Sequence, residues 1–237
     1  MDNPANGADA LSAERTDGTV RYYKRDFWGE ENLKFVTPHF RMVKCARLVN
    51  KAARGRQCDL VDIGCGPGAL SRLLDPNISY YGIDIAIHHP APNLIEADLV
   101  QEPIRFGDRL FDIVVAQGFF EYVGTVQEVK FAEIKEVMHP NGTFIASYTN
   151  FGHRDRNIYW PYSNMQPLAN FRSSLERYFR IHRSFPASHN WGHGQPVKPL
   201  MKALQGPVNA NVPLLSPILA VEYFFICSPR PAPARSA

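Results

Sequence analysis

The segment 60–70 constrains the fold of this chain more than any other stretch. It reads LVDIGCGPGAL, in which a short apolar run reaches Asp62 and three glycines follow at alternate positions, Gly64, Gly66 and Gly68. Only glycine lacks the Cβ atom that keeps other groups away from the backbone, so a glycine-rich turn after an apolar strand indicates a bulky group against the chain. A cofactor that contains a nucleoside is the first candidate.

Composition places the chain among compact soluble enzymes. With 237 residues, 45% of them apolar and 12% aromatic, it suits one large α/β domain or two small ones. The net charge of +3 is too small for a general nucleic-acid binder. The sequence has no apolar run of about 18 residues and a polar N-terminus, so it predicts no membrane span and no signal peptide, and we expect a cytoplasmic protein.

The cysteines form neither a CxxC pair nor a set with histidine at metal-ligand spacing. They are Cys45, Cys58, Cys65 and Cys227. This pattern argues against a zinc site and against a disulfide framework, and it predicts four packing thiols.

Beyond Cys58, short apolar runs alternate with connections, which is typical of a parallel sheet because parallel strands need crossovers. Strands are predicted at 58–63, 79–84, 93–96, 111–116, 143–149, 179–185 and 219–227, and helices at 67–74, 125–138 and 167–178. The second helix begins with a capping box of Thr125 and Glu128. Only eight residues separate Asp84 from Asn93, too few for a full crossover helix.

An amphipathic helix is predicted before these strands, with Thr37 as its N-cap, Pro38 at its first position and Gly55 just past its end. Its basic face carries Arg41, Lys44, Arg47, Lys51 and Arg54, and small apolar residues form the opposite stripe. The basic face is either solvated or turned toward an anionic substrate or partner.

Composition also divides the chain. Residues 1–20 and 229–237 are rich in Pro, Ala and charge, which predicts disordered tails around a single domain at 21–228. Within it, the segment 186–218 is broken by prolines and carries Trp191 between two histidines. Loops of that length usually cover or build a site, so this segment is a candidate lid.

The glycine loop by itself also fits the dinucleotide fingerprint. Asp84, 20 residues after Gly64, suits two ribose hydroxyls, but NAD-binding folds place an acid there as well. The third strand ends in EADL, where Asp98 is placed to accept an adenine amino proton and Leu99 to contact the ring. The run FDIVVAQGFFEYV at 111–123 then supplies a fourth strand that ends at Gln117.

These four motifs, in this order and spacing, resemble the class I S-adenosylmethionine-dependent methyltransferases, whose motifs have the form DxGCGxG, an acidic end to strand two, xADL and FDxVxxxxxxEHV. The resemblance covers about residues 55–150. It implies a Rossmann-like α/β fold with a seven-stranded, mostly parallel sheet, an antiparallel last strand, helices on both faces and an N-terminal cap at 21–56. Past Asn150, the run NFGHRDRN resembles the MetW-like branch of that superfamily.

The resemblance implies S-adenosylmethionine as cofactor and a set of residues that bind it, namely Asp62, Gly64, Cys65, Gly66, Gly68, Asp84, Ile85, Asp98, Leu99 and Gln117. The segment RYYKRDFWGEE resembles the part that caps the cofactor in such enzymes. There Tyr22 and Trp28 either form an aromatic wall beside the sulfonium or anchor the N-terminal helix to the core.

The catalytic candidates are less constrained. Relatives often carry His where Tyr122 stands, and this tyrosine could be a base, a hydrogen-bond donor or a packing residue. For a hydroxyl acceptor, a histidine near the methyl group would be useful because its pKa lies near the working pH. His153, His189 and His193 are the candidates.

We therefore expect a methyltransferase that acts on oxygen or nitrogen of a small molecule, such as a secondary metabolite or a modified sugar. The MetW-like resemblance implies an alternative, a non-catalytic partner of a biosynthetic acyltransferase. A nicotinamide-dependent oxidoreductase would leave EADL and the strand at 111–116 unexplained. The oligomeric state stays open, a homodimer included, and neither a nucleic acid nor a membrane is expected as a partner.

Overall fold

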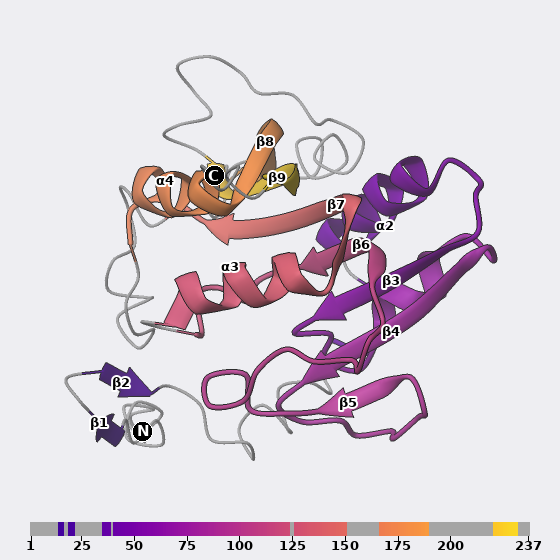
Figure 1. Cartoon of the computed structure of the whole chain (residues 1–237), viewed down its shortest axis with the longest axis horizontal. Coiled ribbons are helices and arrows are strands. Elements are labelled where there is room, and N and C mark those ends of the chain that lie inside the picture. Colours follow the sequence, from indigo (N-terminus) through magenta and orange to yellow (C-terminus); the bar gives the residue numbers. More distant parts are fainter. Residues whose placement is uncertain are drawn as a thin grey trace, which may run out of the picture.

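The computed structural model describes residues 14–16, 19–21, 35–38, 40–123, 126–150, 166–189 and 220–231 (Figure 1). Seven strands form one sheet in the order β5-β4-β3-β6-β7-β9-β8. They are β3 (Cys58–Ile63), β4 (Ile78–Asp84), β5 (Leu94–Glu96), β6 (Phe111–Ala116), β7 (Met138–Thr149), β8 (Phe179–His189) and β9 (Ala220–Pro229). Every strand predicted from the apolar runs is present, and β7 and β8 are longer than predicted.

The strand directions follow the expected pattern. The five strands β5, β4, β3, β6 and β7 are parallel to one another, whereas β9 lies between β7 and β8 and is antiparallel to both. The chain order runs outward from β3 through β4 to β5 on one side, and from β6 to β7 on the other. The order therefore reverses between β3 and β6, and ligands of open α/β sheets bind at such a point, beyond the carboxyl ends of the strands.

Helices cover both faces of the sheet (Figure 1). On one face, α2 (Phe40–Ala53) and the short 3₁₀ helix η1 (Ala69–Leu73) pack over apolar side chains of β3, β6 and β7. On the other face, α3 (Gln127–Glu136) and α4 (Leu168–Tyr178) bury Phe131 and Phe171 against the sheet. The segment between β4 and β5 has no helix, as its length predicts.

Three helix boundaries differ from the prediction. The turn predicted as a helix at 67–74 is the 3₁₀ helix η1, because Gly68 before it is in the left-handed region at φ 68° and Leu74 after it is extended. The N-terminal helix begins at Phe40, not at Pro38. The predicted capping box of Thr125 and Glu128 is wrong, because the N-cap of α3 is Val126 and no side chain caps this helix.

The basic face of α2 is not uniformly solvated. Arg47, Lys51 and Arg54 are exposed, but Lys44 is buried and Arg41 is half-buried. Both side chains lie where α2 crosses β8 and β9, and both bind groups of those strands. The opposite stripe packs as predicted, with Cys45, Val49 and Ala53 fully buried.

Some predictions fall wholly or partly outside the described residues. Residues 14–16 and 19–21 form a short antiparallel ladder, β1 (Glu14–Thr16) with β2 (Thr19–Arg21), in a region predicted to be disordered. Of the predicted lid, residues 186–189 extend strand β8, and 190–218 lie outside the described residues. All four cysteines are buried free thiols, as predicted.

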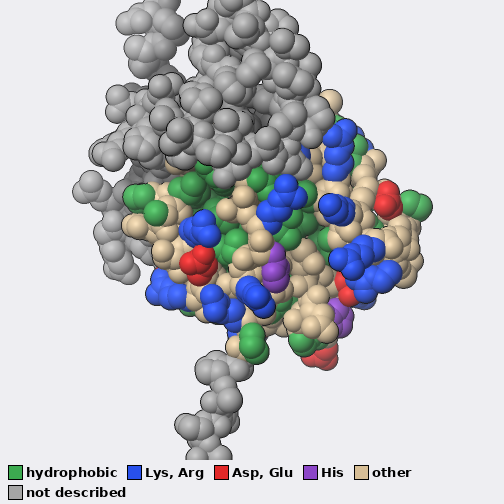
Figure 2. All heavy atoms as spheres, turned by 90° about the horizontal axis from the view of Figure 1, so that it is seen from above, with side chains coloured by type: hydrophobic (Ala, Val, Ile, Leu, Met, Phe, Trp, Pro, Cys, Tyr) green, Lys and Arg blue, Asp and Glu red, His purple; other side chains and the backbone are tan. Residues whose placement is uncertain are grey.

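Figure 2 shows Lys and Arg side chains spread over the face seen from above, separated by hydrophobic and neutral groups. The edge strand β8 contributes to such a surface, since Arg180, His182 and Arg183 are exposed along it. Charged side chains on an edge strand oppose pairing with another chain. Within the described ranges, the helices are too short or too polar to span a bilayer.

Candidate cofactor and acceptor site

The glycine loop after β3 is shaped by backbone that other residues rarely adopt. Gly64, Gly66 and Gly68 have φ angles of 74°, 55° and 68°, in the left-handed region that side chains with a Cβ disfavour. A Cβ on Gly64 would lie 3.3 Å from the Phe119 ring. The loop is therefore held close to the segment that follows β6, at the point where the strand order reverses.

Asp84, the last residue of β4, fixes this loop. Its Oδ2 accepts a hydrogen bond from the Gly66 amide at 2.6 Å, and its Oδ1 accepts one from the Ile85 amide at 2.7 Å. Burial raises the pKa of Asp84, and the backbone hydrogen bonds oppose that rise. Because a carboxylate has about four acceptor positions, both oxygens keep the capacity to accept further hydrogen bonds from a bound ribose.

Asp62, at the carboxyl end of β3, is only 5% exposed. Its Oδ2 accepts a hydrogen bond from the Tyr80 hydroxyl at 2.9 Å. Burial is the main reason that the pKa of Asp62 is raised to about 7. The charge of Asp84 acts in the same direction, and the hydrogen bond from Tyr80 acts in the opposite direction. Cys65 beside it is buried, and its sulfur packs against Gly82 of β4.

The segment after β5 uses its polar groups within its own turn. Asp98 accepts hydrogen bonds from the Val100 amide at Oδ1 and from the Gln101 side chain at Oδ2, each at 3.0 Å. The side chain of Leu99 is buried in the core beneath this turn. The turn lies at the same sheet edge as Asp84, but an adenine ring would meet little of the Leu99 side chain.

The segment after β6 carries Gln117 and Gly118 toward the loop. Gly118 has a φ of 64°, and its amide donates to Ser147 Oγ on β7 at 2.9 Å. The Gln117 side-chain amide nitrogen is buried and has no hydrogen-bond partner among the residues described. Gln117 therefore stands at the strand end where the prediction placed it, with a donor available to a ligand.

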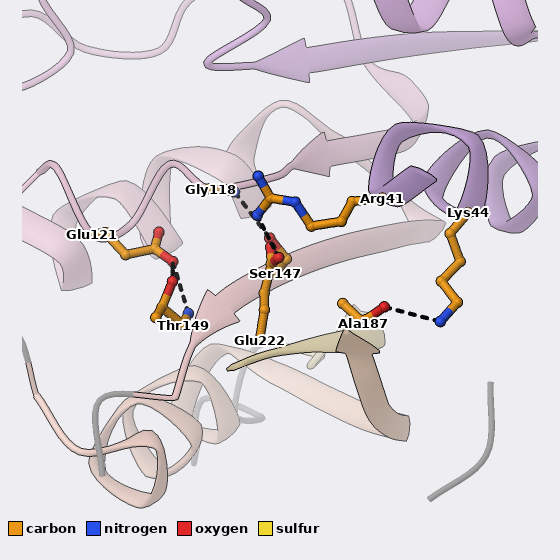
Figure 3. Close-up of polar contacts among 8 residues, drawn as sticks. All are labelled: Arg41, Lys44, Gly118, Glu121, Ser147, Thr149, Ala187 and Glu222. Carbon is orange, nitrogen blue, oxygen red and sulfur yellow. Dashed lines mark hydrogen bonds and ion pairs between the residues drawn. The ribbon is translucent and has the colours of Figure 1, made fainter. Parts of the chain in front are cut away.

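A second set of charged groups lies on the other side of the reversal point (Figure 3). Arg41, in the first turn of α2, forms an ion pair with Glu222 on β9, with 2.5 Å between Nη1 and Oε2. Glu121, in the segment after β6, accepts hydrogen bonds from the amide and the hydroxyl of Thr149 at 2.7 and 2.8 Å. We call Arg41, Glu121, Thr149 and Glu222 the acceptor-side cluster.

Burial governs the electrostatics of this cluster. Burial first and the charge of Glu222 second raise the pKa of Glu121 to about 7, with the hydrogen bonds from Thr149 acting in the opposite direction. Lys44, one turn along α2, donates to the Ala187 carbonyl at 3.0 Å. Burial lowers the pKa of Lys44 to about 8, and the charge of Glu222 acts in the opposite direction.

The predicted catalytic residues are only partly described. Tyr122 is half-buried and follows Glu121. The pKa of Arg41 is raised overall: burial lowers it, but the charge of Glu222 and, more weakly, those of Glu121 and Tyr122 raise it. Tyr122 is therefore close enough to interact with the cluster. His189 ends β8 at the same sheet edge, described by its backbone alone. His153, His193, Tyr22 and Trp28 lie outside the described residues.

The site roles of Glu121, Thr149 and Glu222 were not predicted from the sequence. Arg41 was predicted only as part of a basic helix face. A signal for the two glutamates was present. Each is a single acid within an apolar run, FFEYV and AVEYFF, and charged side chains are almost never fully buried unless paired. What the sequence lacked was the pairing itself, because 181 positions separate Arg41 from Glu222.

The residues present fit S-adenosylmethionine. The loop glycines leave room that a Cβ at Gly64 would reduce, and two carboxylates, Asp62 and Asp84, end neighbouring strands beside it. A nucleoside with ribose hydroxyls and a cationic group suits such a backbone cradle lined with carboxylates. The positions of the glycine loop and of the two carboxylates are compatible with the predicted cofactor.

The comparisons with known proteins agree with this fit. A family described as methyltransferase domain matches residues 38–182, which is more than half of the chain. A comparison with curated protein sequences gave no match.

Several solved structures share the fold at low sequence identity. A TehB-like SAM-dependent methyltransferase from Corynebacterium glutamicum has a TM-score of 0.52 and 15% identity, covering 86% of this chain and 95% of that one. The N-methyltransferase NodS from Bradyrhizobium japonicum, solved with S-adenosylhomocysteine, has a TM-score of 0.52 and 12% identity, covering 86% and 99%. A complex between the Haloferax volcanii methyltransferase activator Trm112 and a candidate methyltransferase has a TM-score of 0.60 and 15% identity, covering 89% and 97%.

Proposed function

The chain belongs to the methyltransferase domain family of class I S-adenosylmethionine-dependent enzymes, and from this premise we propose that it methylates oxygen or nitrogen of a small-molecule acceptor. A secondary metabolite or a modified sugar is the expected kind of acceptor. The observation that carries the proposal is the glycine loop held on Asp84 by the Gly66 amide, opposite a second set of buried polar groups.

Several residues would hold the cofactor. Asp84 would accept hydrogen bonds from the ribose hydroxyls, because its oxygens keep free acceptor positions beside Gly66 and Ile85. Asp62 and the glycines would face the methionine and ribose portion. Gln117 would lie at the methionine end, where its buried amide nitrogen has a donor to offer.

S-adenosylmethionine supplies a methyl carbon that is already activated by the sulfonium. The task of the chain is then to hold an acceptor in line with that carbon, since alignment at close range can supply much of the rate enhancement. The acceptor-side cluster stands where it could orient an acceptor, across the reversal point from Asp84. Tyr122, beside this cluster, and His153, His189 and His193 remain proposed catalytic residues.

A small acceptor is proposed because the polar groups near the site are buried and few. Glu121 and Glu222 are 4% and 1% exposed, which suits a ligand that enters the protein better than a strand of nucleic acid. The alternative, a non-catalytic partner of an acyltransferase, is not favoured by the family match or by the solved methyltransferases named above.

Calorimetric titration with S-adenosylhomocysteine tests the cofactor site. We expect the protein to bind it, and Asp84→Asn to raise the dissociation constant by roughly ten- to a hundredfold, because hydrogen bonds to a charged acceptor are lost. Asp108→Asn, at an exposed aspartate away from the loop, is the matched control and should leave binding unchanged. Preferred binding of NADH, or unchanged binding by Asp84→Asn, would contradict the assignment.

A further inference from the structure

Two buried carboxylates lie close together on the acceptor side. Thr149 of β7 and Glu222 of β9 are directly opposite in the antiparallel ladder, and the Cβ atoms of such pairs are about 4.5 to 5.5 Å apart on one face of the sheet. Glu121 binds Thr149 through both the amide and the hydroxyl. The register of β7 and β9 therefore links both glutamates to Thr149, and the charge of Glu222 acts on Glu121.

These carboxylates are incompletely satisfied. Glu121 uses Oε1 for Thr149, and Glu222 uses Oε2 for Arg41. The remaining oxygens, Glu121 Oε2 and Glu222 Oε1, are buried and have no hydrogen-bond partner within the described part of the chain. A buried acceptor left without a donor costs about 1 to 3 kcal/mol, and more when it is charged, so a ligand that donates to these two oxygens would remove that cost.

The charges of the cluster indicate what fills it. The guanidinium of Arg41 forms an ion pair with Glu222, and Glu121 interacts with it only through its charge. The ammonium group of Lys44 lies on the same helix face and donates to the Ala187 carbonyl. A ligand that brings a positive charge and several N–H donors would complement both open oxygens, whereas a hydroxyl brings one donor and no charge.

The place of the cluster connects it to the transfer site. Glu121 and Thr149 stand at the carboxyl ends of β6 and β7, on the same edge of the sheet as Asp62 and Asp84. The segment that carries Glu121 also carries Phe119, which packs against Gly64 of the cofactor loop. Gln117, which opens this segment, adds a buried donor of its own.

We propose that the methyl acceptor is an amine and that Glu121 and Glu222 bind its nitrogen, each through its open oxygen. The proposal rests on the proposed function and names the acceptor class for the same site. The bound ammonium group donates hydrogen bonds from its N–H groups to the two carboxylates. Glu121 Oε2 then takes one proton, so that the N–H bond breaks, its electron pair stays on nitrogen and a neutral nucleophile is left in place.

The surroundings favour Glu121 over Glu222 for this proton. Among the described residues, the charged and titratable groups around it are Glu222 of β9, Arg41 of α2, Tyr148 of β7 and the neighbouring Tyr122. Glu222 already uses Oε2 in the direct ion pair with Arg41. Burial and the charge of Glu222 together raise the pKa of Glu121 to about 7, so this carboxyl can both accept and release a proton near neutral pH.

Binding of matched probes tests the acceptor class. Wild-type protein, Glu121→Gln and Glu222→Gln are first titrated with S-adenosylhomocysteine, and the saturated complexes are then titrated with cyclohexylamine or cyclohexanol. Glu121→Gln is the gentler variant, because its amide oxygen can still accept both hydrogen bonds from Thr149. Glu136→Gln, at an exposed glutamate of α3, is the matched control. Circular dichroism and the melting temperature establish that each variant is folded.

We expect the wild-type complex to bind the amine more tightly than the alcohol. Glu121→Gln and Glu222→Gln should each weaken amine binding by roughly ten- to a hundredfold, with S-adenosylhomocysteine binding unchanged within about threefold. Equal binding of amine and alcohol, or unchanged amine binding by Glu121→Gln, would overturn the proposal. Loss of S-adenosylhomocysteine binding in both variants would also overturn it, because the carboxylates would then hold the amino group of the cofactor.

The two proposals fail in distinguishable ways. If the wild-type protein binds S-adenosylhomocysteine but not the amine, the acceptor class is wrong and the cofactor site stands. If the wild-type protein does not bind S-adenosylhomocysteine, the proposed function is wrong and the acceptor assignment fails with it.

Discussion

The two halves of the site treat their buried carboxylates differently. In the cofactor half, Asp84 binds backbone amides through both oxygens and Asp62 binds the Tyr80 hydroxyl, all within residues 62–85. In the acceptor half, Glu121 and Glu222 each leave one oxygen without a partner within the described ranges. The first half is shaped by its own loop, and the second is assembled from distant segments with positions left open for a ligand.

Under the proposed function, this difference separates the binding of the methyl donor from the choice of the acceptor. Contacts within a single strand–loop–strand unit form the cofactor half and need only local sequence to be correct. The acceptor half depends on Arg41 reaching β9 and on Lys44 reaching β8, contacts that join α2 to strands far along the chain. Changes in the acceptor half should therefore alter stability and acceptor choice while leaving cofactor binding largely intact.

The largest expected effect comes from removing the cation of the acceptor half. Arg41→Gln should lower the free energy of unfolding by about 3 to 4 kcal/mol, because it leaves the buried Glu222 carboxylate without its ion pair. Urea unfolding monitored by circular dichroism measures this change. The same substitution at Arg172, whose ion pair with Glu176 is exposed, should cost less than about 0.5 kcal/mol.

Similar losses in the two arginine variants would mean that the acceptor half is not the buried assembly described above. Titration of folded Arg41→Gln with S-adenosylhomocysteine sharpens the comparison further. We expect a dissociation constant near that of the wild-type protein, since no described contact of Arg41 reaches the glycine loop.

The pH dependence of stability compares one carboxyl from each half. Burial raises the pKa of both Asp62 and Glu121 to about 7, well above the range of an unfolded chain. The folded state therefore binds these protons more tightly than the unfolded state does. Their stabilising contribution is complete below the unfolded pKa and is lost as the pH rises through about 7.

We expect the free energy of unfolding to fall between pH 5 and pH 8, by about 2 to 3 kcal/mol for each of these two groups. Asp62→Asn and Glu121→Gln should each remove that share of the decrease. Urea unfolding at pH 5, 6, 7 and 8 provides the measurement. A wild-type stability that rises with pH over this range would show that neither carboxyl carries the expected proton.

The smallest of these effects concerns packing beneath the cofactor loop. A Cβ on Gly82 would lie 2.7 Å from the Cys65 sulfur and 2.8 Å from Leu94 Cδ2. Gly82→Ala should cost about 2 kcal/mol through overpacking and should weaken S-adenosylhomocysteine binding, because Cys65 belongs to the glycine loop. Thermal unfolding and titration measure the two effects.

Gly55→Ala is the matched control for that variant. Gly55 has a φ of 72° but no atom within 4 Å of an added Cβ, so only backbone strain of about 1 kcal/mol is expected and cofactor binding should not change. If amine binding fell in Gly82→Ala while S-adenosylhomocysteine binding did not, the division of the site into two halves would be wrong.

Much of the fold could be predicted because its signals are local. The apolar runs at 58–63 and 111–116 predicted β3 and β6, since strands that are buried on both faces are rich in apolar residues. Helix starts were less predictable. Val126 is the N-cap of α3 and no side chain caps the helix, so the box of Thr125 and Glu128 predicted a helix start that the folded protein does not have.

The candidate site also has one part that was predictable from local sequence and one part that was not. The sequence by itself determined the glycine loop and the carboxylate that fixes it, because left-handed glycines and an acid at the next strand end are local features that leave a readable pattern. Only the tertiary structure decided the acceptor half. Arg41, Glu121 and Glu222 come from three separate segments, and their meaning as a buried cluster depends on strand register and on where α2 crosses the sheet, which no local pattern encodes.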